Sequence, residues 1–446
     1  MSGPLHLLEG EGQSLPRVPR RRTRGRPSWA VDPIDELAER LVEPVSSAVH
    51  PYEVAALLES DGLTGDQIRQ RYARPDLFTL AEDLYHRVPR HYPEPPVGPD
   101  PWRPDHWRCV LRGIVFALPG LAYVLGAGLW RGGSGLTGLV AAALFAWAWN
   151  QGLSHRAYLR LSGEGPAGAG RSLAVGAPAG ALAASAVAFG ISGPGPAALF
   201  ATGQSLYLAA ATVLLVLGRE RTLALTLLPV AAGAVATFWW RPPAALAIAL
   251  LLTTVLLAGG AAGHGLRGFL KEDRADGVTP PRLVRSLPYG LFGLAAGTLA
   301  VSGGAAGARA VVVLTLSMGF AEWLLYRFRG AAVAALRASA TGRALTLRAG
   351  RVLGLCLGAY LLALLAGALV TGSDPLLLLG LGALLWTGLL LQAFGVAWPP
   401  AGVCLLAAAG SSAQLPGPLG AALVPVAALA LGGWAWYLLA RPTAHR

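Results

Sequence analysis

A series of long apolar runs limits what this chain can fold into. From Cys109 onward, stretches rich in Ala, Leu, Gly and Val recur, separated by short polar or basic connections. Each run is about twenty residues long, which as a helix crosses the roughly 30 Å hydrocarbon core of a bilayer. Charged residues make up 13% of the chain, against about 25% in soluble domains. The sequence therefore predicts an all-α polytopic membrane protein.

The apolar runs predict about twelve transmembrane helices. The predicted spans are residues 109–130, 134–153, 172–192, 196–217, 221–240, 242–262, 287–305, 308–327, 351–371, 375–396, 399–414 and 417–440. Most basic residues precede the first span or follow the even-numbered spans, whereas the opposite connections hold little beyond Arg131, Arg241 and Arg309. Because basic loops stay on the cytoplasmic side, we expect a multi-pass protein of the cell membrane with both termini in the cytoplasm.

The chain before the first span has a different composition, rich in Arg, Glu, Asp and Pro. Residues 1–30 are expected to be a disordered basic tail, which either contacts anionic lipid or is simply solvated. Residues 31–105 are expected to form a small cytosolic helical module followed by a Pro-rich tether. Thr64 and Gln67 have the spacing of a capping box at one of its helix starts. Because the four short helices expected there can bury only a small core, a docking or regulatory role is predicted, and no catalytic constellation is found.

An internal repeat is predicted from the arginines and from the loop lengths. In one register Arg112 matches Arg285 and Arg156 matches Arg329, and in both halves a basic loop of about twenty residues follows the second span. The expected domains after the tether are a first six-helix half (106–262), a cytoplasmic linker (263–286), a second six-helix half (287–440) and a cytoplasmic tail (441–446). Two halves of six spans have the same orientation, so a parallel repeat is predicted, which is a transporter architecture.

Two segments carry a resemblance to a known family. They are Trp147 to Arg156 (WAWNQGLSHR) and Phe320 to Arg329 (FAEWLLYRFR), each in the second helix of its half. Together with an arginine near the start of each half, they resemble the multidrug/oligosaccharidyl-lipid/polysaccharide exporter superfamily. Within it, the chain is most similar to the polysaccharide and lipid-linked-sugar flippases. The resemblance implies alternating-access export; the added N-terminal module and a very short first outer loop depart from the family pattern.

Major facilitators also have parallel six-helix halves. Their Gly-x-x-x-Asp-Arg-x-Gly-Arg-like loop has no counterpart between Gly152 and Arg171, where the acid and the spacing are missing. This family therefore ranks second among transporters.

Several polar side chains within the spans are candidate site residues. Glu322 lies well inside an apolar run, where a carboxylate is costly and should face the bundle or a cavity. It is expected either to carry a coupling proton or to form an interfacial ion pair with Arg327 or Arg329. The basic candidates for a phosphate-binding mouth, or alternatively plain topology anchors, are Arg112, Arg156, Arg285 and Arg329. The uncharged candidates for substrate contact, or alternatively for helix–helix hydrogen bonds, are Asn150, Gln151 and Gln204.

Other classes of function fit less well. The net charge of +12 comes largely from loop arginines, so nucleic acid is not expected as a partner. No Cys/His cluster and no nucleotide-binding loop are found, so no metal, cofactor or enzymatic activity is predicted. The expected partners are the lipid bilayer, an anionic lipid-linked sugar as substrate, and a cytosolic or envelope-assembly protein binding residues 31–105.

The predicted function is that of a transporter or flippase exporting a polysaccharide or lipid-linked sugar. The alternatives are a non-transporting membrane partner of a cell-surface assembly complex and a small-molecule exporter.

Overall fold

The computed structural model divides the chain into two compact units, Met1–Pro99 and Asp100–Arg446. It describes residues 32–91, 105–128, 135–272, 279–304, 308–339, 341–413 and 418–441. The expected basic tail, the Pro-rich tether and the last residues of the chain lie outside these ranges. Every regular element within them is a helix, so the predicted all-α class is confirmed.

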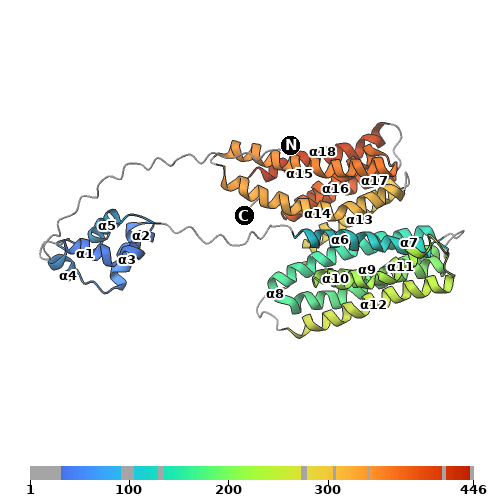
Figure 1. The fold of residues 1–446 in the computed structure, drawn as a ribbon, viewed down its shortest axis with the longest axis horizontal. Coiled ribbons are helices and arrows are strands. Elements are labelled where there is room, and N and C mark those ends of the chain that lie inside the picture. The colour runs from blue at the N-terminus through green and yellow to red at the C-terminus, as the bar shows by residue number, and fades with distance from the viewer. Residues whose placement is uncertain are drawn as a thin grey trace, which may run out of the picture. The chain divides into compact units, whose positions relative to one another are not determined.

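The first unit is a module of five short helices around a small core. They are α1 (Pro33–Arg40), α2 (Val42–Ser47), α3 (Pro51–Ser60), α4 (Gly65–Arg71) and α5 (Leu77–Arg87). Asp32 and Asp76 accept backbone N–H groups at the starts of α1 and α5, and the predicted capping box at Thr64 and Gln67 is present. Leu58, Leu80 and their neighbours form the buried core. Figure 1 shows the five helices packed together, and the buried residues give the module its own apolar interior.

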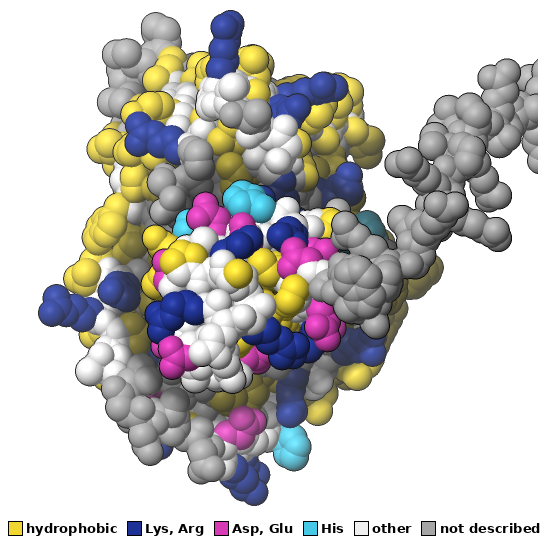
Figure 2. All heavy atoms as spheres, turned by 90° about the vertical axis from the view of Figure 1, so that its left-hand side faces the viewer, with side chains coloured by type: hydrophobic (Ala, Val, Ile, Leu, Met, Phe, Trp, Pro, Cys, Tyr) yellow, Lys and Arg dark blue, Asp and Glu magenta, His cyan; other side chains and the backbone are white. Residues whose placement is uncertain are grey.

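The second unit contains the apolar helices. They are α6 (His106–Ala117), α7 (Leu121–Gly126), α8 (Leu136–Ser192), α9 (Pro196–Val216), α10 (Glu220–Thr226), α11 (Leu228–Ala236), α12 (Ala244–Lys271), α13 (Leu287–Gly304), α14 (Ala308–Arg337), α15 (Gly342–Thr371), α16 (Pro375–Ala393), α17 (Trp398–Ser412) and α18 (Pro418–Leu439). Among the described residues, nine helical segments are long and apolar enough to cross a membrane. Large exposed side chains such as Leu256 and Leu429 suit lipid-facing surfaces, and Figure 2 shows broad areas of hydrophobic side chains. The chain is a helical multi-pass membrane protein.

Helix α8 is a hairpin of two antiparallel arms. Its backbone breaks at Gly165, where φ is +77°, and Pro166 begins the second arm. Trp149 of the first arm donates to the Gly176 carbonyl of the second at 2.8 Å, and the Ser192 hydroxyl meets Gly138 near the arm ends. The sequence predicted a basic loop of about twenty residues here. That prediction is wrong, because the basic segment continues the two helices until the glycine turn.

The helices of the second unit form two bundles, each with a separate core. The first bundle comprises α6–α12 and the second comprises α13–α18, and they appear as the lower and upper groups in Figure 1. The core of the first bundle is built between Val115 and Ala262, and that of the second between Phe292 and Leu439. Each bundle therefore has its own apolar interior, and the two six-helix repeats stay a prediction.

The two bundles meet through their first and second helices. α6 of the first bundle packs on α14, and α13 of the second bundle packs on α8. Both contacts use glycines: a Cβ at Gly319 would lie 2.6 Å from the Cys109 carbonyl oxygen, and one at Gly290 would lie 3.0 Å from the Ala148 carbonyl oxygen. Small residues let helix backbones approach closely in membranes, where van der Waals packing drives association.

Candidate functional site

Four charged side chains meet where α6 contacts α14. The Nη1 of Arg112 donates to Glu322 of α14, while its Nε and Nη2 donate to Oε1 of Glu220 at 3.1 and 3.0 Å. Arg108 donates to the same oxygen of Glu220 at 3.0 and 2.8 Å. We call these residues (Arg108, Arg112, Glu220 and Glu322) the ion cluster. It joins the two bundles, because Glu322 comes from the second and the others come from the first.

The ion cluster is withdrawn from solvent and electrically balanced. The side chain of Glu220 is 7% exposed, and those of Arg112 and Glu322 are 18% and 20% exposed. Arg108 is nearly half exposed. Two guanidinium groups face two carboxylates, so the formal charges cancel. Such balance is expected where charges leave water, because an unpaired buried charge costs several kcal/mol.

Local structure places each member of the cluster. Arg108 and Arg112 are four residues apart on α6 and therefore project from the same face. Asp105 caps this helix by accepting the Arg108 backbone N–H at 3.1 Å. Glu220 begins α10 directly after a turn at Gly218, whose φ is +69°. Its position at a helix N-terminus, where backbone N–H groups point outward, also favours the negative charge.

The cluster changes the interpretation of Glu322. The sequence predicted a coupling proton or an ion pair with Arg327 or Arg329, close along the chain. In the structure its partner is instead Arg112, 210 residues away. Glu220 was missed because it lies between Arg219 and Arg221, in a sequence typical of a solvated basic loop. Its place at the edge of an apolar run was the one available signal.

The remaining arginines of the predicted mouth lie apart from this cluster. Arg156 donates to the Pro281 carbonyl at 2.9 Å, and Arg329 donates to the Ala393 carbonyl at 3.3 Å and faces the Phe394 ring. Arg285 is exposed. A shared phosphate site formed by the four arginines stays a prediction.

The uncharged candidates are distributed along the first bundle. Gln204 accepts a hydrogen bond from the Tyr123 hydroxyl at 2.6 Å. Gln151 lies against Gly293 of α13, in the contact between the bundles. Asn150 has a buried side-chain oxygen for which the described residues provide no hydrogen-bond partner. Such an atom is costly to bury unsatisfied, and a role of these three residues in substrate contact stays a prediction.

His155 joins the bundles at the α8–α13 contact. Its ring stacks on Tyr289 with centroids 3.6 Å apart, and its Nδ1 lies 3.1 Å from the Ser286 hydroxyl. His155 therefore lies in the contact between the two bundles.

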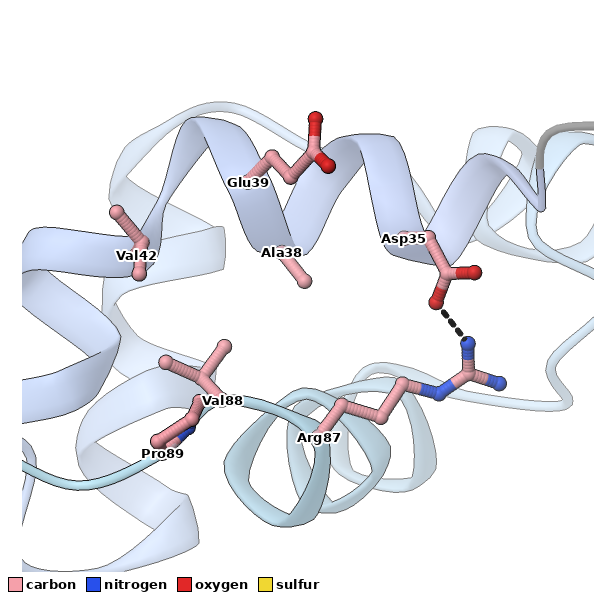
Figure 3. Close-up of a pocket in the computed structure, with 7 residues that line it drawn as sticks. All are labelled: Asp35, Ala38, Glu39, Val42, Arg87, Val88 and Pro89. Atoms are coloured by element: carbon pink, nitrogen blue, oxygen red, sulfur yellow. Dashed lines mark hydrogen bonds and ion pairs between the residues drawn. The ribbon is translucent and has the colours of Figure 1, made fainter. Parts of the chain in front are cut away.

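A shallow groove is present on the N-terminal module. Its lining residues are Asp35, Ala38, Glu39, Val42, Arg87, Val88 and Pro89 (Figure 3). The cavity is about 260 Å³, whereas pockets for drug-sized ligands are about 300–1,000 Å³. The Arg87 guanidinium already donates hydrogen bonds to the carboxylates of Asp35 and Asp32, at 2.6 and 2.9 Å. The groove is thus too small and open for a typical small-molecule site.

Fold and ion cluster together define the class: a helical multi-pass membrane protein whose two bundles are joined by glycine contacts and by buried charge pairs. Comparison with protein-family models, curated proteins and solved structures gives no match for this chain. The function is therefore argued from the geometry.

Proposed function

We propose that this protein is a membrane transporter in which the two bundles rock against each other to give alternating access. The observation that carries the proposal is the pattern of contacts between bundles. The first helix of each bundle packs on the second helix of the other, α6 on α14 and α13 on α8. This exchange has the symmetry of a two-fold axis, and parallel halves related in this way are typical of carriers.

The packing within each bundle supports the same symmetry. The fourth helix packs on the sixth (α9 on α12, α16 on α18), and the first on the fifth (α6 and α7 on α10 and α11, α13 on α17). Counting the two arms of α8, the pair α10–α11 and the short α17 as spans gives twelve, six per bundle. Together with the basic loops, this layout favours a parallel repeat with both termini in the cytoplasm.

The ion cluster provides a latch for such a movement. When the bundles separate at α6 and α14, Arg108, Arg112 and Glu220 stay together with a net charge of +1, and Glu322 leaves with a charge of −1. An anionic headgroup can then replace Glu322 at Arg112, because a guanidinium binds phosphate and carboxylate oxygens with the same geometry. Protonation of Glu322 would release the latch in the same way. The proposed substrate is accordingly an anionic lipid-linked sugar or polysaccharide, as the family resemblance implies.

The experiment measures surface polysaccharide and lipid-linked precursor in a deletion strain. Complementation uses wild type, Glu322→Gln and Asp374→Asn, the last being a charge-neutralising control at the cap of α16. Loss of surface glycan with accumulated precursor, restored by wild type and the control but not by Glu322→Gln, is expected. Unchanged glycan and precursor in the deletion strain would exclude this substrate class and favour a small-molecule exporter.

A second candidate function is that of a non-transporting partner in a cell-surface assembly complex. It is favoured by the N-terminal module, a compact unit with its own core that an exporter does not need. In this case a chain lacking residues 1–99 would lose function completely. A transporter is expected to retain at least part of its flux without the module.

A further inference from the structure

The surface of the N-terminal module carries a row of exposed aromatic and apolar side chains. Tyr52, Phe78 and Val49 are 67%, 60% and 66% exposed. The Tyr52 ring contacts Phe78 edge-on with centroids 5.7 Å apart, and His50 with centroids 4.7 Å apart. The Tyr85 hydroxyl donates to the Val49 carbonyl at 2.7 Å. We call the four exposed residues Val49, His50, Tyr52 and Phe78 the aromatic stripe, and Tyr85 supports it from the edge of the module's core.

The aromatic stripe lies outside the core that holds the module together. That core is made by other residues, among them Leu58, Leu80 and Leu84, which are fully buried. Exposed rings gain little from burial on folding, yet the edge contact keeps the Tyr52 and Phe78 rings together, and the Tyr85 hydroxyl fixes the Val49 backbone beside them. Ordered exposed aromatics are characteristic of the centres of protein interfaces, because they bury large areas with little further loss of entropy.

The charge around the stripe indicates what would cover it. Glu53 adjoins Tyr52, Asp76 precedes Phe78 at the start of α5, and Glu82 lies one turn after Phe78. Residues 32–91 hold twelve Asp and Glu against six Arg, a net charge of −6 in a chain of +12. An anionic lipid surface would repel this module. A basic protein segment complements it.

We propose that the aromatic stripe is the docking surface for a partner protein that presents a basic segment with apolar side chains. The rings would receive the apolar residues, and Glu53, Asp76 and Glu82 would face the Lys or Arg residues at the rim. Rim charges of this kind raise the association rate and make binding sensitive to salt. The proposal does not depend on transport, since it concerns the module's own surface.

The test uses the full chain in nanodiscs of zwitterionic lipid. The probe is a labelled helical peptide with leucines on one face and lysines on the other, and a glutamate version serves as the charge control. The double variant Tyr52→Ser/Phe78→Ser is compared with Val42→Ser, which removes an apolar side chain that is 48% exposed elsewhere on the module. We expect the lysine peptide to bind, the double variant to weaken binding by about tenfold or more, and Val42→Ser to change it little.

Several outcomes would overturn the proposal. They are absence of lysine-peptide binding, equal binding of the glutamate peptide, and equal losses in Val42→Ser and the double variant. Flotation with anionic vesicles that is abolished by Tyr52→Ser/Phe78→Ser would identify a membrane-binding surface instead. A marked gain in peptide affinity on deleting residues 1–31 would indicate that the chain's own arginine-rich segment, Arg17 to Arg26, is the occupant.

Discussion

At the scale of single residues, the two carboxylates of the ion cluster have unequal tasks. Glu220 accepts four N–H groups from Arg108 and Arg112, whereas Glu322 accepts one from Arg112. Glu220 holds the first bundle's own charges together, and Glu322 makes the connection to the second bundle. Stability and movement are therefore expected to depend on different members of the same cluster.

Neutralising Glu220 should destabilise the protein more than neutralising Glu322. Glu220→Gln leaves Arg108 and Arg112 close together with one carboxylate, and the cost is about 2 kcal/mol because Arg108 is half exposed. After Glu322→Gln, Arg112 keeps Glu220, so the loss should stay below about 1 kcal/mol. Thermal unfolding in detergent, with Asp374→Asn as control, ranks the two variants by their Tm. A lower Tm for Glu322→Gln than for Glu220→Gln would contradict the division of tasks.

In the N-terminal module, Asp32 should make stability depend on acid pH. The Ile34 backbone N–H and the Arg87 guanidinium hold the pKa of Asp32 below its usual value. Its charged form is thus favoured by folding, so the stabilisation is present above the unfolded pKa near 4 and is lost as pH falls through the lower folded value. Since Asp32 and Arg87 are both partly exposed, the change in the free energy of unfolding is below about 1 kcal/mol.

Asp32→Asn keeps the helix cap and removes the charge. Amide exchange of α1 and α5 in the full chain, corrected for intrinsic rates, should rise between about pH 5 and about pH 2 in wild type, and more weakly in this variant. Identical pH profiles would show that the Asp32–Arg87 pair contributes nothing.

At the scale of elements, the contacts between bundles depend on glycine. α6 and α14 approach at Gly113 and Gly319, and the α8–α13 contact uses Gly152 and Gly290. Glycine within a helix lowers stability by about 1 kcal/mol per residue relative to alanine. Close backbone approach compensates that cost at these positions.

Gly319→Ala should therefore destabilise the protein although alanine favours helices. The new Cβ would lie 2.6 Å from the Cys109 carbonyl oxygen, so α6 and α14 must move apart, at a cost of about 1–3 kcal/mol. The matched control is Gly358→Ala in α15, where no atom beyond the chain neighbours and the helix's own backbone lies within 4 Å of the added Cβ. The control should gain up to about 1 kcal/mol from helix propensity. Equal Tm changes for both variants would mean that the α6–α14 approach is not tight.

At the scale of the whole molecule, the proposed rocking requires the α8–α13 contact to change during transport. Gly152 and Gly290 face each other there, and a Cβ at either would lie within 4 Å of the other's Cα. The separation is close to that needed for a disulfide, but a Cβ at Gly290 would lie 3.0 Å from the Ala148 carbonyl oxygen, so the two helices must shift by a few tenths of an ångström to accept it. The native Cys109, Cys356 and Cys404 are free and would first be replaced by alanine.

The pair Gly152→Cys/Gly290→Cys should cross-link on oxidation and stop transport, with reductant restoring it. Each single cysteine variant is the control, and the measurement is flux of the lipid-linked precursor before and after reduction. Full transport with complete cross-linking would show that the bundles do not separate at this contact.

The sequence by itself determined the class of protein and much of the module. Apolar length and charge alternation are local quantities, so they predicted membrane helices, and the capping box at Thr64 acts within one turn. Gly165 and the residues before it gave a misleading signal, because arginines that suit a loop also extend a helix beyond the bilayer.

Tertiary structure decided which charges meet. Arg112 and Glu322 are far apart in sequence. The sequence around Glu220 is typical of a solvated loop, and only the packing of α6 beside α10 buries this side chain. An ion pair between distant residues depends on how helices pack, and no local pattern of hydropathy or charge contains that information. The same holds for the paired glycines and for His155 on Tyr289, whose contacts exist only once the two bundles are placed together.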